Sequence, residues 1–359
     1  MNPRAIVQYL HRLQKKISWQ AVSIVLSILI IASASYVLYR LLQDIDLREV
    51  YLALRRTPTY ALVLAGIFVA LGYITLTFYD YFALRTIGRT EIPYRTAALG
   101  GFTSYSIGHN VGFSVISGGA VRYRIYSVSG LDAVEVAKIC FIAGLTFWLG
   151  NVAFLGLGLI IDPDAANAID KLPTFVNRWL GAAALLALLA YVVWVSAAPR
   201  SIGIGRERWH VTLPGGRLTL IQIALGIVDL SCASAAMYML MPNAPQIDFV
   251  SLAVIFVTAT LLGFASHSPG GLGVFDAAML IALMHFDRQS LLRFGKENIL
   301  GALLLFRLYY YIAPFALSLA ILGVREFILD LKPVAQKIRE QKVFARRKKR
   351  CPSGSRRKK

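Results

Sequence analysis

The hydrophobic pattern of the chain consists of long apolar runs separated by short charged segments. About 20 consecutive apolar residues cross the hydrocarbon core of a bilayer, so these runs predict membrane-spanning helices. Of the 359 residues, 57% are hydrophobic and 16% are charged. We therefore expect an all-α, polytopic integral membrane protein with about eight transmembrane helices and one or two re-entrant or broken segments. The predicted spans are residues 19–42, 59–84, 137–161, 179–198, 217–241, 250–265, a short 272–286 that either crosses or re-enters, and 298–324.

Three sections follow from this pattern. A basic lead covers residues 1–18, a membrane domain covers residues 19–324, and a basic tail covers residues 325–359. The first apolar run is too long for the core of a cleaved signal peptide and has no small-residue cleavage site, so we expect it to remain as the first span.

Much of the formal net charge of +19 lies near the two ends of the chain, as in the run RRKKR at residues 346–350. Basic segments beside membrane spans indicate a cytoplasmic location and contact with an anionic lipid surface. No nucleic-acid-binding module is visible, so nucleic acid is not expected as a partner. The prediction is a bacterial inner (plasma) membrane protein with both termini in the cytoplasm.

Loop charges predict the rest of the topology. The loop at residues 199–217 is basic and should be cytoplasmic, as should the turn that carries Arg85, Arg89 and Arg95. The loop after Ile161 is acidic and should be external. These assignments agree with a cytoplasmic N-terminus only if residues 94–116, which are rich in glycine, make no net crossing. We therefore expect a re-entrant segment there.

A second interrupted segment, SHSPGGLGVFD, spans residues 266–276 and contains one proline and three glycines. Proline removes a backbone donor and glycine weakens a helix interior, so a continuous helix is not expected there. Broken backbone at membrane depth is tolerated where it is buried in protein or lines a wet cavity. This stretch therefore predicts a functional site.

The two interrupted segments share a short pattern. Arg124 lies five residues after the second glycine of Ser117-Gly118-Gly119, and Asp276 lies five residues after the second glycine of Pro269-Gly270-Gly271. Each of these blocks follows a histidine, His109 or His267. Paired broken helices in inverted repeats are a device of transporters. A chance match remains the alternative, because glycine pairs are common in membrane helices.

Three stretches resemble a known family. They are GHNVGFSVISGGAVRYRIYSVSGL at residues 108–131, TFWLGN at 146–151, and SPGGLGVFD at 268–276. They resemble the lysylphosphatidylglycerol synthetase and flippase family, also called multiple peptide resistance factor. The resemblance implies a polytopic module that moves aminoacylated phosphatidylglycerol between leaflets. Asp276 stands where the family often has glutamate.

The resemblance also implies a soluble aminoacyl-transferase domain in two-part members. Residues 325–359 are too few for such a domain, so we expect a stand-alone transmembrane module rather than an enzyme. Stand-alone relatives are tied to other lipids as well, such as hopanoids, which leaves the lipid open.

The polar residues near the interrupted segments suggest a lipid head-group site. We expect Arg122 and Arg124 to hold phosphate, helped by N–H groups of Gly118 and Gly119, with interfacial anchoring as the alternative for the arginines. Asp276 would either form an ion pair with an ammonium group of the lipid or hold the short helix after Pro269 in place. Pro269, Gly270 and Gly271 are further candidates, because they break the helix and would create a polar notch. The last candidates are His109 and His267, which either bind phosphate, carry protons or have a structural role.

Three further charges lie near or inside spans: Asp80, Asp229 and Arg307. Charges at membrane depth are costly, so a functional role is expected, with pairing of Asp229 and Arg307 as the alternative. Asp80 is near the end of its run and could be interfacial. Tyr309, Tyr310 and Tyr311 would form an interfacial belt or a cavity wall.

No metal-ligand spacing, nucleotide-binding loop or nucleophile-and-base set is visible, so no cofactor, metal or catalytic residue is expected. The sequence predicts a lipid-binding and translocation protein for an anionic or aminoacylated phospholipid such as lysylphosphatidylglycerol. The alternatives are an accessory subunit that serves a separate lipid-modifying enzyme and, ranked last, a membrane-embedded enzyme. Homo-oligomerisation is left open.

Overall fold

The computed structural model describes Tyr36 and residues 47–112, 114–203, 210–241, 247–266, 268–286 and 296–328. Apart from Tyr36, the predicted first span lies outside these residues, as do the basic lead and residues 329–359 of the tail. Five helices in the described part are long and apolar enough to cross a membrane, which confirms an all-α polytopic protein. They are Thr59–Thr86, Ala133–Ile161, Thr174–Ala197, Gly216–Leu240 and Ile299–Ile328.

The elements follow one another along the chain with short connections. They are α3 (Leu47–Arg56), α4 (Thr59–Thr86), α5 (Tyr94–Val111), α6 (Ser114–Tyr126), the 3₁₀ turn η1 (Ser127–Ser129), α7 (Ala133–Ile161), α8 (Pro163–Asp170), α9 (Thr174–Ala197), β1 (Ser201–Gly203), β2 (His210–Thr212), α10 (Gly216–Leu240), α11 (Phe249–Ala265), the 3₁₀ turn η2 (Pro269–Gly271), α12 (Val274–Phe286), α14 (Lys296–Phe306) and the π-helical turn η3 (Arg307–Ile312). The helix of α14 and η3 continues to Ile328, and we call Ile299–Ile328 the last helix.

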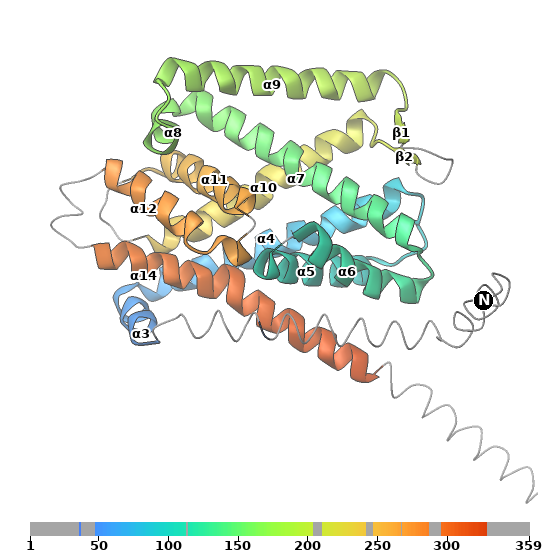
Figure 1. Ribbon diagram of the computed structural model, residues 1–359, viewed down its shortest axis with the longest axis horizontal. Helices are drawn as coiled ribbons and strands as arrows, with labels where there is room; N and C mark the ends of the chain where they lie inside the picture. The colour runs from blue at the N-terminus through green and yellow to red at the C-terminus, as the bar shows by residue number, and fades with distance from the viewer. Residues whose placement is uncertain are drawn as a thin grey trace, which may run out of the picture.

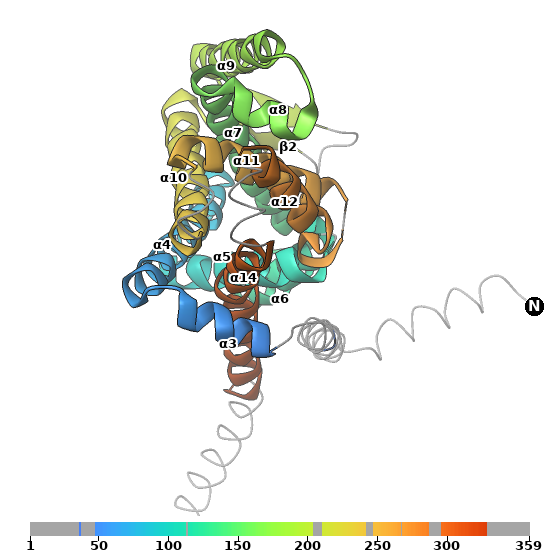
Figure 2. The same ribbon diagram turned by 90° about the vertical axis from the view of Figure 1, so that its left-hand side faces the viewer.

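The five long helices run between two ends of the molecule (Figure 1). One end carries α3 and α8, and the other carries the antiparallel pair of β1 and β2. The acidic segment after Ile161 and the described parts of the basic loop, residues 199–203 and 210–217, therefore lie at opposite ends, as the predicted topology requires. Viewed along the helices, α9 lies at the edge beside α7, while α10 lies between α7 and α4 (Figure 2).

Close backbone contact joins α7 to α10. A methyl group built on Gly150 would lie 2.5 Å from the Cα of Gly226, so only glycine fits at this crossing. Small residues let membrane helices approach closely, and association then comes from van der Waals packing rather than from the hydrophobic effect. This crossing holds α10, and with it Asp229, near the centre of the bundle.

The short strands β1 and β2 are the one departure from an all-helical architecture in the described residues. They pair antiparallel, with Ile202 opposite Val211. Val211 is buried and packs in a hydrophobic cluster with Leu84 and Ile92, which ties this loop to the end of α4. With three residues each, the strands are too short to give a readable alternation of polar and apolar positions.

Helices α5 and α6 form a tight hairpin. The chain turns at Gly112, whose φ of 81° lies in the left-handed region that favours glycine. A methyl group on Gly118 would lie 3.0 Å from the carbonyl oxygen of Ser104, so the two helices pack nearly backbone to backbone. The hairpin returns the chain to the end from which it came, which fits the re-entrant segment expected at residues 94–116.

Helices α11 and α12 form a second hairpin from the opposite end. The outer ends of both helices lie beside α8, and the break between them contains Gly270, Gly271 and Gly273 with φ values of 59°, 63° and 78°. At 17 and 13 residues, α11 and α12 are shorter than the five spanning helices. The tips of the two hairpins point toward each other (Figure 1), an arrangement that fits the suggested inverted repeat.

Candidate functional site

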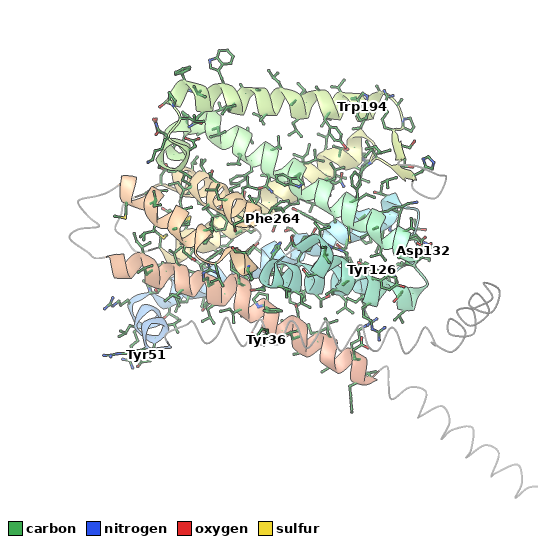
Figure 3. The ribbon with its side chains drawn as sticks, viewed as in Figure 1. Tyr36, Tyr51, Tyr126, Asp132, Trp194 and Phe264 are labelled. Atoms are coloured by element: carbon green, nitrogen blue, oxygen red, sulfur yellow. The ribbon has the colours of Figure 1, made fainter. Side chains whose placement is uncertain are left out.

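A cavity of about 220 Å³ lies where the two hairpin tips meet. The structure therefore brings together the two interrupted segments that the sequence singled out. Phe264, near the centre of the molecule in Figure 3, forms part of the wall. The polar and glycine residues of the wall come from both hairpins and from neighbouring helices: Gly108, His109, Gly112, Ser114, Asp229, Thr260, Gly263, Ser268, Gly270, Gly271, Tyr310 and Tyr311. We call this space the central cavity.

A buried ion pair ties the first hairpin to α4. Arg122 donates from Nε to both carboxylate oxygens of Asp80, at 3.1 and 3.0 Å, and from Nη2 to Oδ1 at 2.7 Å. The hydroxyl of Tyr126 donates to Asp80 Oδ2 at 2.6 Å. The ring of Tyr105 lies 4.8 Å from the Arg122 guanidinium carbon, a cation–π contact.

Asp80 is therefore fully buried rather than interfacial. Arg122 lies behind the wall of the central cavity and is not among the residues that line it. Its predicted contact with phosphate would require this ion pair to open, and it stays a prediction.

Arg124 also forms an ion pair, in this case with Glu326 of the last helix. Arg325 donates to the same glutamate at 3.2 Å, so three charges gather between α6 and the last helix. Arg124 does not line the central cavity either, and its role toward phosphate likewise stays a prediction.

A third ion pair holds the break of the second hairpin. Arg307 donates from Nε to Asp276 Oδ1 at 3.0 Å and, in the same fork, from Nη1 to the carbonyl oxygen of Gly270 at 3.1 Å. Asp276 Oδ2 also accepts from the backbone N–H of Gly273 at 3.1 Å. Arg307 sits in the π-helical turn η3, a local widening that is frequent at functional sites. This geometry corresponds to the structural alternative for Asp276, fixing the half-helix, and its contact with an ammonium group stays a proposal.

The last helix thus supplies one partner to each hairpin. Arg307 pairs with Asp276 of α12, and Glu326 pairs with Arg124 of α6. Arg124 and Asp276 are the residues at matching offsets from the two glycine pairs, and their charges are opposite. One helix therefore contacts both hairpins and fixes their relative positions.

Asp229 differs from the other two buried carboxylates. It accepts a hydrogen bond from the hydroxyl of Tyr79 at 3.3 Å, and its Oδ1 has no hydrogen-bond partner in the described part of the chain. The suggested pairing of Asp229 with Arg307 is wrong, because Arg307 is held by Asp276 and Gly270. Asp229 instead lines the central cavity from α10.

The other predicted site residues separate into different surroundings. His109 lines the central cavity, with its ring 5.6 Å from that of Tyr105. Gly118 faces α5, whereas Gly119 faces Cys140 of α7. Pro269 begins η2, and His267 lies outside the described residues. Tyr310 and Tyr311 form cavity wall, one of the two expected arrangements.

Several residues of this region were not predicted. Tyr79, Tyr105 and Tyr126 surround the buried charges, and Thr260 lines the cavity from α11. No spacing in the sequence marks them, because a tyrosine or threonine in an apolar run gives no sign of which helix it will face.

The fold and the cavity define a polytopic helical membrane protein with a cavity, lined by apolar and some polar residues, between two broken hairpins. Residues 21–318 match the family model described as the lysylphosphatidylglycerol synthase TM region, and the chain belongs to this family. The family resemblance seen in the sequence is thereby confirmed.

Individual relatives are consistent with this family. An uncharacterized protein of Synechocystis sp. is 30% identical over 76% of this chain and 83% of its own length. The inner membrane protein YbhN of Escherichia coli is 28% identical over 84% of this chain and 91% of its own length. Phosphatidylglycerol lysyltransferase of Staphylococcus aureus is 26% identical over 81% of this chain, and the match covers 32% of that enzyme. The similarity of this chain to these proteins supports a membrane location and an interaction with phospholipid.

Proposed function

We propose that the protein binds the head group of a phospholipid in the central cavity and lets it cross the bilayer. The observation that carries this proposal is the meeting of two hairpins, entering from opposite ends, at one cavity whose wall includes polar side chains and glycine backbone. Non-helical backbone at membrane depth is tolerated where it is buried in protein or lines a wet cavity, and both breaks line this cavity. Substrate sites between opposed broken helices are a recurrent arrangement in transporters.

The lining suits a head group with hydrogen-bonding oxygens. Ser114, Ser268 and His109 offer polar side chains, and the glycines at the two breaks leave their backbone accessible. Tyr310, Tyr311 and Phe264 supply aromatic surface, against which a cationic group can also rest. An anionic or aminoacylated phospholipid such as lysylphosphatidylglycerol combines both kinds of group.

The lysyltransferase relatives favour a second candidate function. In those proteins the matched region accounts for about a third of the chain, so such a module can occur alongside an enzyme. An accessory role would be to present the lipid to a separate lipid-modifying enzyme. Both candidates require lipid in the central cavity, and they differ in whether lipid crosses the bilayer without a partner.

Binding is tested by mass spectrometry of lipids that co-purify with the protein in mild detergent. Thr260→Phe places a large side chain in the cavity and should remove the enriched phospholipid. Thr258→Phe is the matched control, because Thr258 lies on the same helix, is likewise half-buried, bonds its own helix backbone in the same way and does not line the cavity. Equal lipid profiles in the two variants would contradict binding in this cavity.

A further inference from the structure

A second space, on the outer surface of the bundle, adjoins the central cavity. It is a groove of about 760 Å³ between α6 and α7, lined by apolar side chains and small residues. We call it the α6–α7 groove. Its size falls within the usual range of about 300–1,000 Å³ for ligand sites.

The groove and the central cavity share one lining residue, Val115. Val115 and its neighbour Ile116 form the tip of the first hairpin, and they are 72% and 73% exposed. At membrane depth, exposed apolar side chains face lipid rather than water. Here they form an apolar lip between the central cavity, whose wall includes polar side chains, and the apolar groove.

Small residues keep the groove open. Gly119 and Ala120 line it from α6, and Ala137 and Gly144 line it from α7. A methyl group on Gly144 would meet no atom within 4 Å, so the space beside it is empty. Trp148 and Phe141 form the outer part of the same wall and are exposed.

The position along α7 matches one leaflet. The groove extends from Ala133, at the first residue of α7, to Trp148 near the centre of the bundle. Fifteen residues of helix rise about 22 Å, enough to span half of a hydrocarbon core that is about 30 Å thick. Since α7 is a membrane span, the medium outside the groove is hydrocarbon.

We propose that the α6–α7 groove holds an acyl chain of the phospholipid whose head group occupies the central cavity, with the head entering sideways past Val115. This inference rests on the proposed function and adds the route by which the lipid enters. It also explains why the first hairpin presents apolar residues at its tip: Val115 and Ile116 contact the glycerol and upper chain region while the polar head lies inside.

Cys140 provides a natural reporter, since it lines the groove and is partly exposed, whereas Cys232 is buried. The experiment uses the full chain with Cys351→Ser, purified in detergent and alkylated with N-ethylmaleimide. Dioleoyl phosphatidylglycerol is titrated, alkylation is followed by intact-protein mass spectrometry, and lipid binding is measured in parallel. We expect the lipid to slow alkylation of Cys140 in a saturable way, and Thr260→Phe, which fills the central cavity, to abolish this protection.

Four results would overturn the inference. Equal protection in Thr260→Phe would show lipid that covers the groove independently of the cavity. Binding of phosphatidylglycerol without protection of Cys140 would place the acyl chain elsewhere and leave the proposed function standing. A Cys140 that is unreactive in delipidated protein would show that the groove is covered by protein, either a second copy or another segment of the chain. Absence of phosphatidylglycerol binding altogether would remove the proposed function and this inference together.

A pair of glycine variants tests the groove without relying on Cys140 chemistry. Gly144→Leu fills the open space of the groove, and Gly323→Leu makes the same change on the last helix, where a methyl group also meets nothing within 4 Å. We expect Gly144→Leu alone to lose binding of dioleoyl phosphatidylglycerol while retaining binding of the dihexanoyl lipid, whose chains are too short to fill the groove. Equal loss in both variants, or in neither, would contradict the proposal.

Discussion

The guanidinium of Arg122 forms an ion pair with the carboxylate of Asp80, with Nη2 2.7 Å from Oδ1, and both side chains are buried. The two residues come from α6 and α4, so their ion pair fixes the first hairpin against a membrane span. Removing one partner of a buried pair leaves an uncompensated charge, which costs far more than the net contribution of the intact pair.

Arg122→Ala should therefore lower the free energy of unfolding by about 3–5 kcal/mol. The double variant Asp80→Asn with Arg122→Met removes both charges and keeps an acceptor for Tyr126, so it should recover most of this loss. Thermal unfolding in detergent measures both. An Arg122→Ala protein of unchanged thermal stability that no longer binds lipid would instead assign Arg122 to the head group.

Arg307 offers a test of the second hairpin. Its planar fork reaches Asp276 and the Gly270 carbonyl together, whereas the single ammonium of a lysine is a point charge without that geometry. Arg307→Lys should keep the ion pair with Asp276 and lose the hydrogen bond to the carbonyl oxygen of Gly270. The broken segment is then held less firmly, so phospholipid binding should weaken. The control is Arg325→Lys, beside Glu326 and away from the central cavity. Unchanged lipid binding in Arg307→Lys would show that the Gly270 contact does not shape the site.

Removing the charge of Asp229 should have the opposite effect on stability from removing the charge of Arg122. Asp229 is buried, and none of the ion pairs among the described residues includes it. A buried charge without a counter-ion is costly. Asp229→Asn removes the charge at nearly constant volume and should raise the thermal unfolding temperature. A fall in that temperature would show that the carboxylate of Asp229 stabilises the fold.

The orientation in the membrane can be tested at two exposed loop positions. Leu172 follows α8, and Ser201 begins β1 at the opposite end of the molecule. In a background without the natural cysteines, Leu172→Cys should react with an impermeant maleimide applied outside intact cells. Ser201→Cys should react only after the cells are opened. Ala165, although it lies in the same acidic loop, is fully buried and unsuitable for labelling. The reverse labelling pattern would invert the predicted topology.

The sequence was sufficient to predict the long helices, because their length and apolar character are imposed by the bilayer itself. Residues 59–84 and 217–241, for example, differ by at most two residues at either end from α4 and α10. The two interrupted segments were also predicted, because proline and clustered glycines have few uses inside a membrane helix. Residues 250–265 were predicted as a span and residues 272–286 as a short segment that either crosses or re-enters. The structure pairs them as α11 and α12 in one hairpin, which explains why each is short.

The partners of the buried charges could not be predicted. Pairing depends on the rotation of each helix about its axis and on which helices become neighbours. A local sequence pattern determines neither of these. Asp80 looked interfacial because it lies near the end of its apolar run, yet the returning helix α6 covers it with Arg122 and Tyr126. Arg307 lies far from Asp276 in sequence and meets it only because the last helix crosses the break at Gly270.

The most direct test of the account is leaflet exchange in liposomes that contain the purified protein alone. Fluorescent phosphatidylglycerol is bleached from outside with dithionite, and the fraction that becomes accessible over time is compared among wild type, Thr260→Phe and Thr258→Phe. The account predicts exchange by wild type and Thr258→Phe and its loss in Thr260→Phe. If wild type binds the lipid and yet shows no more exchange than protein-free liposomes, the protein does not translocate phosphatidylglycerol by itself, and the accessory role would replace the proposed function.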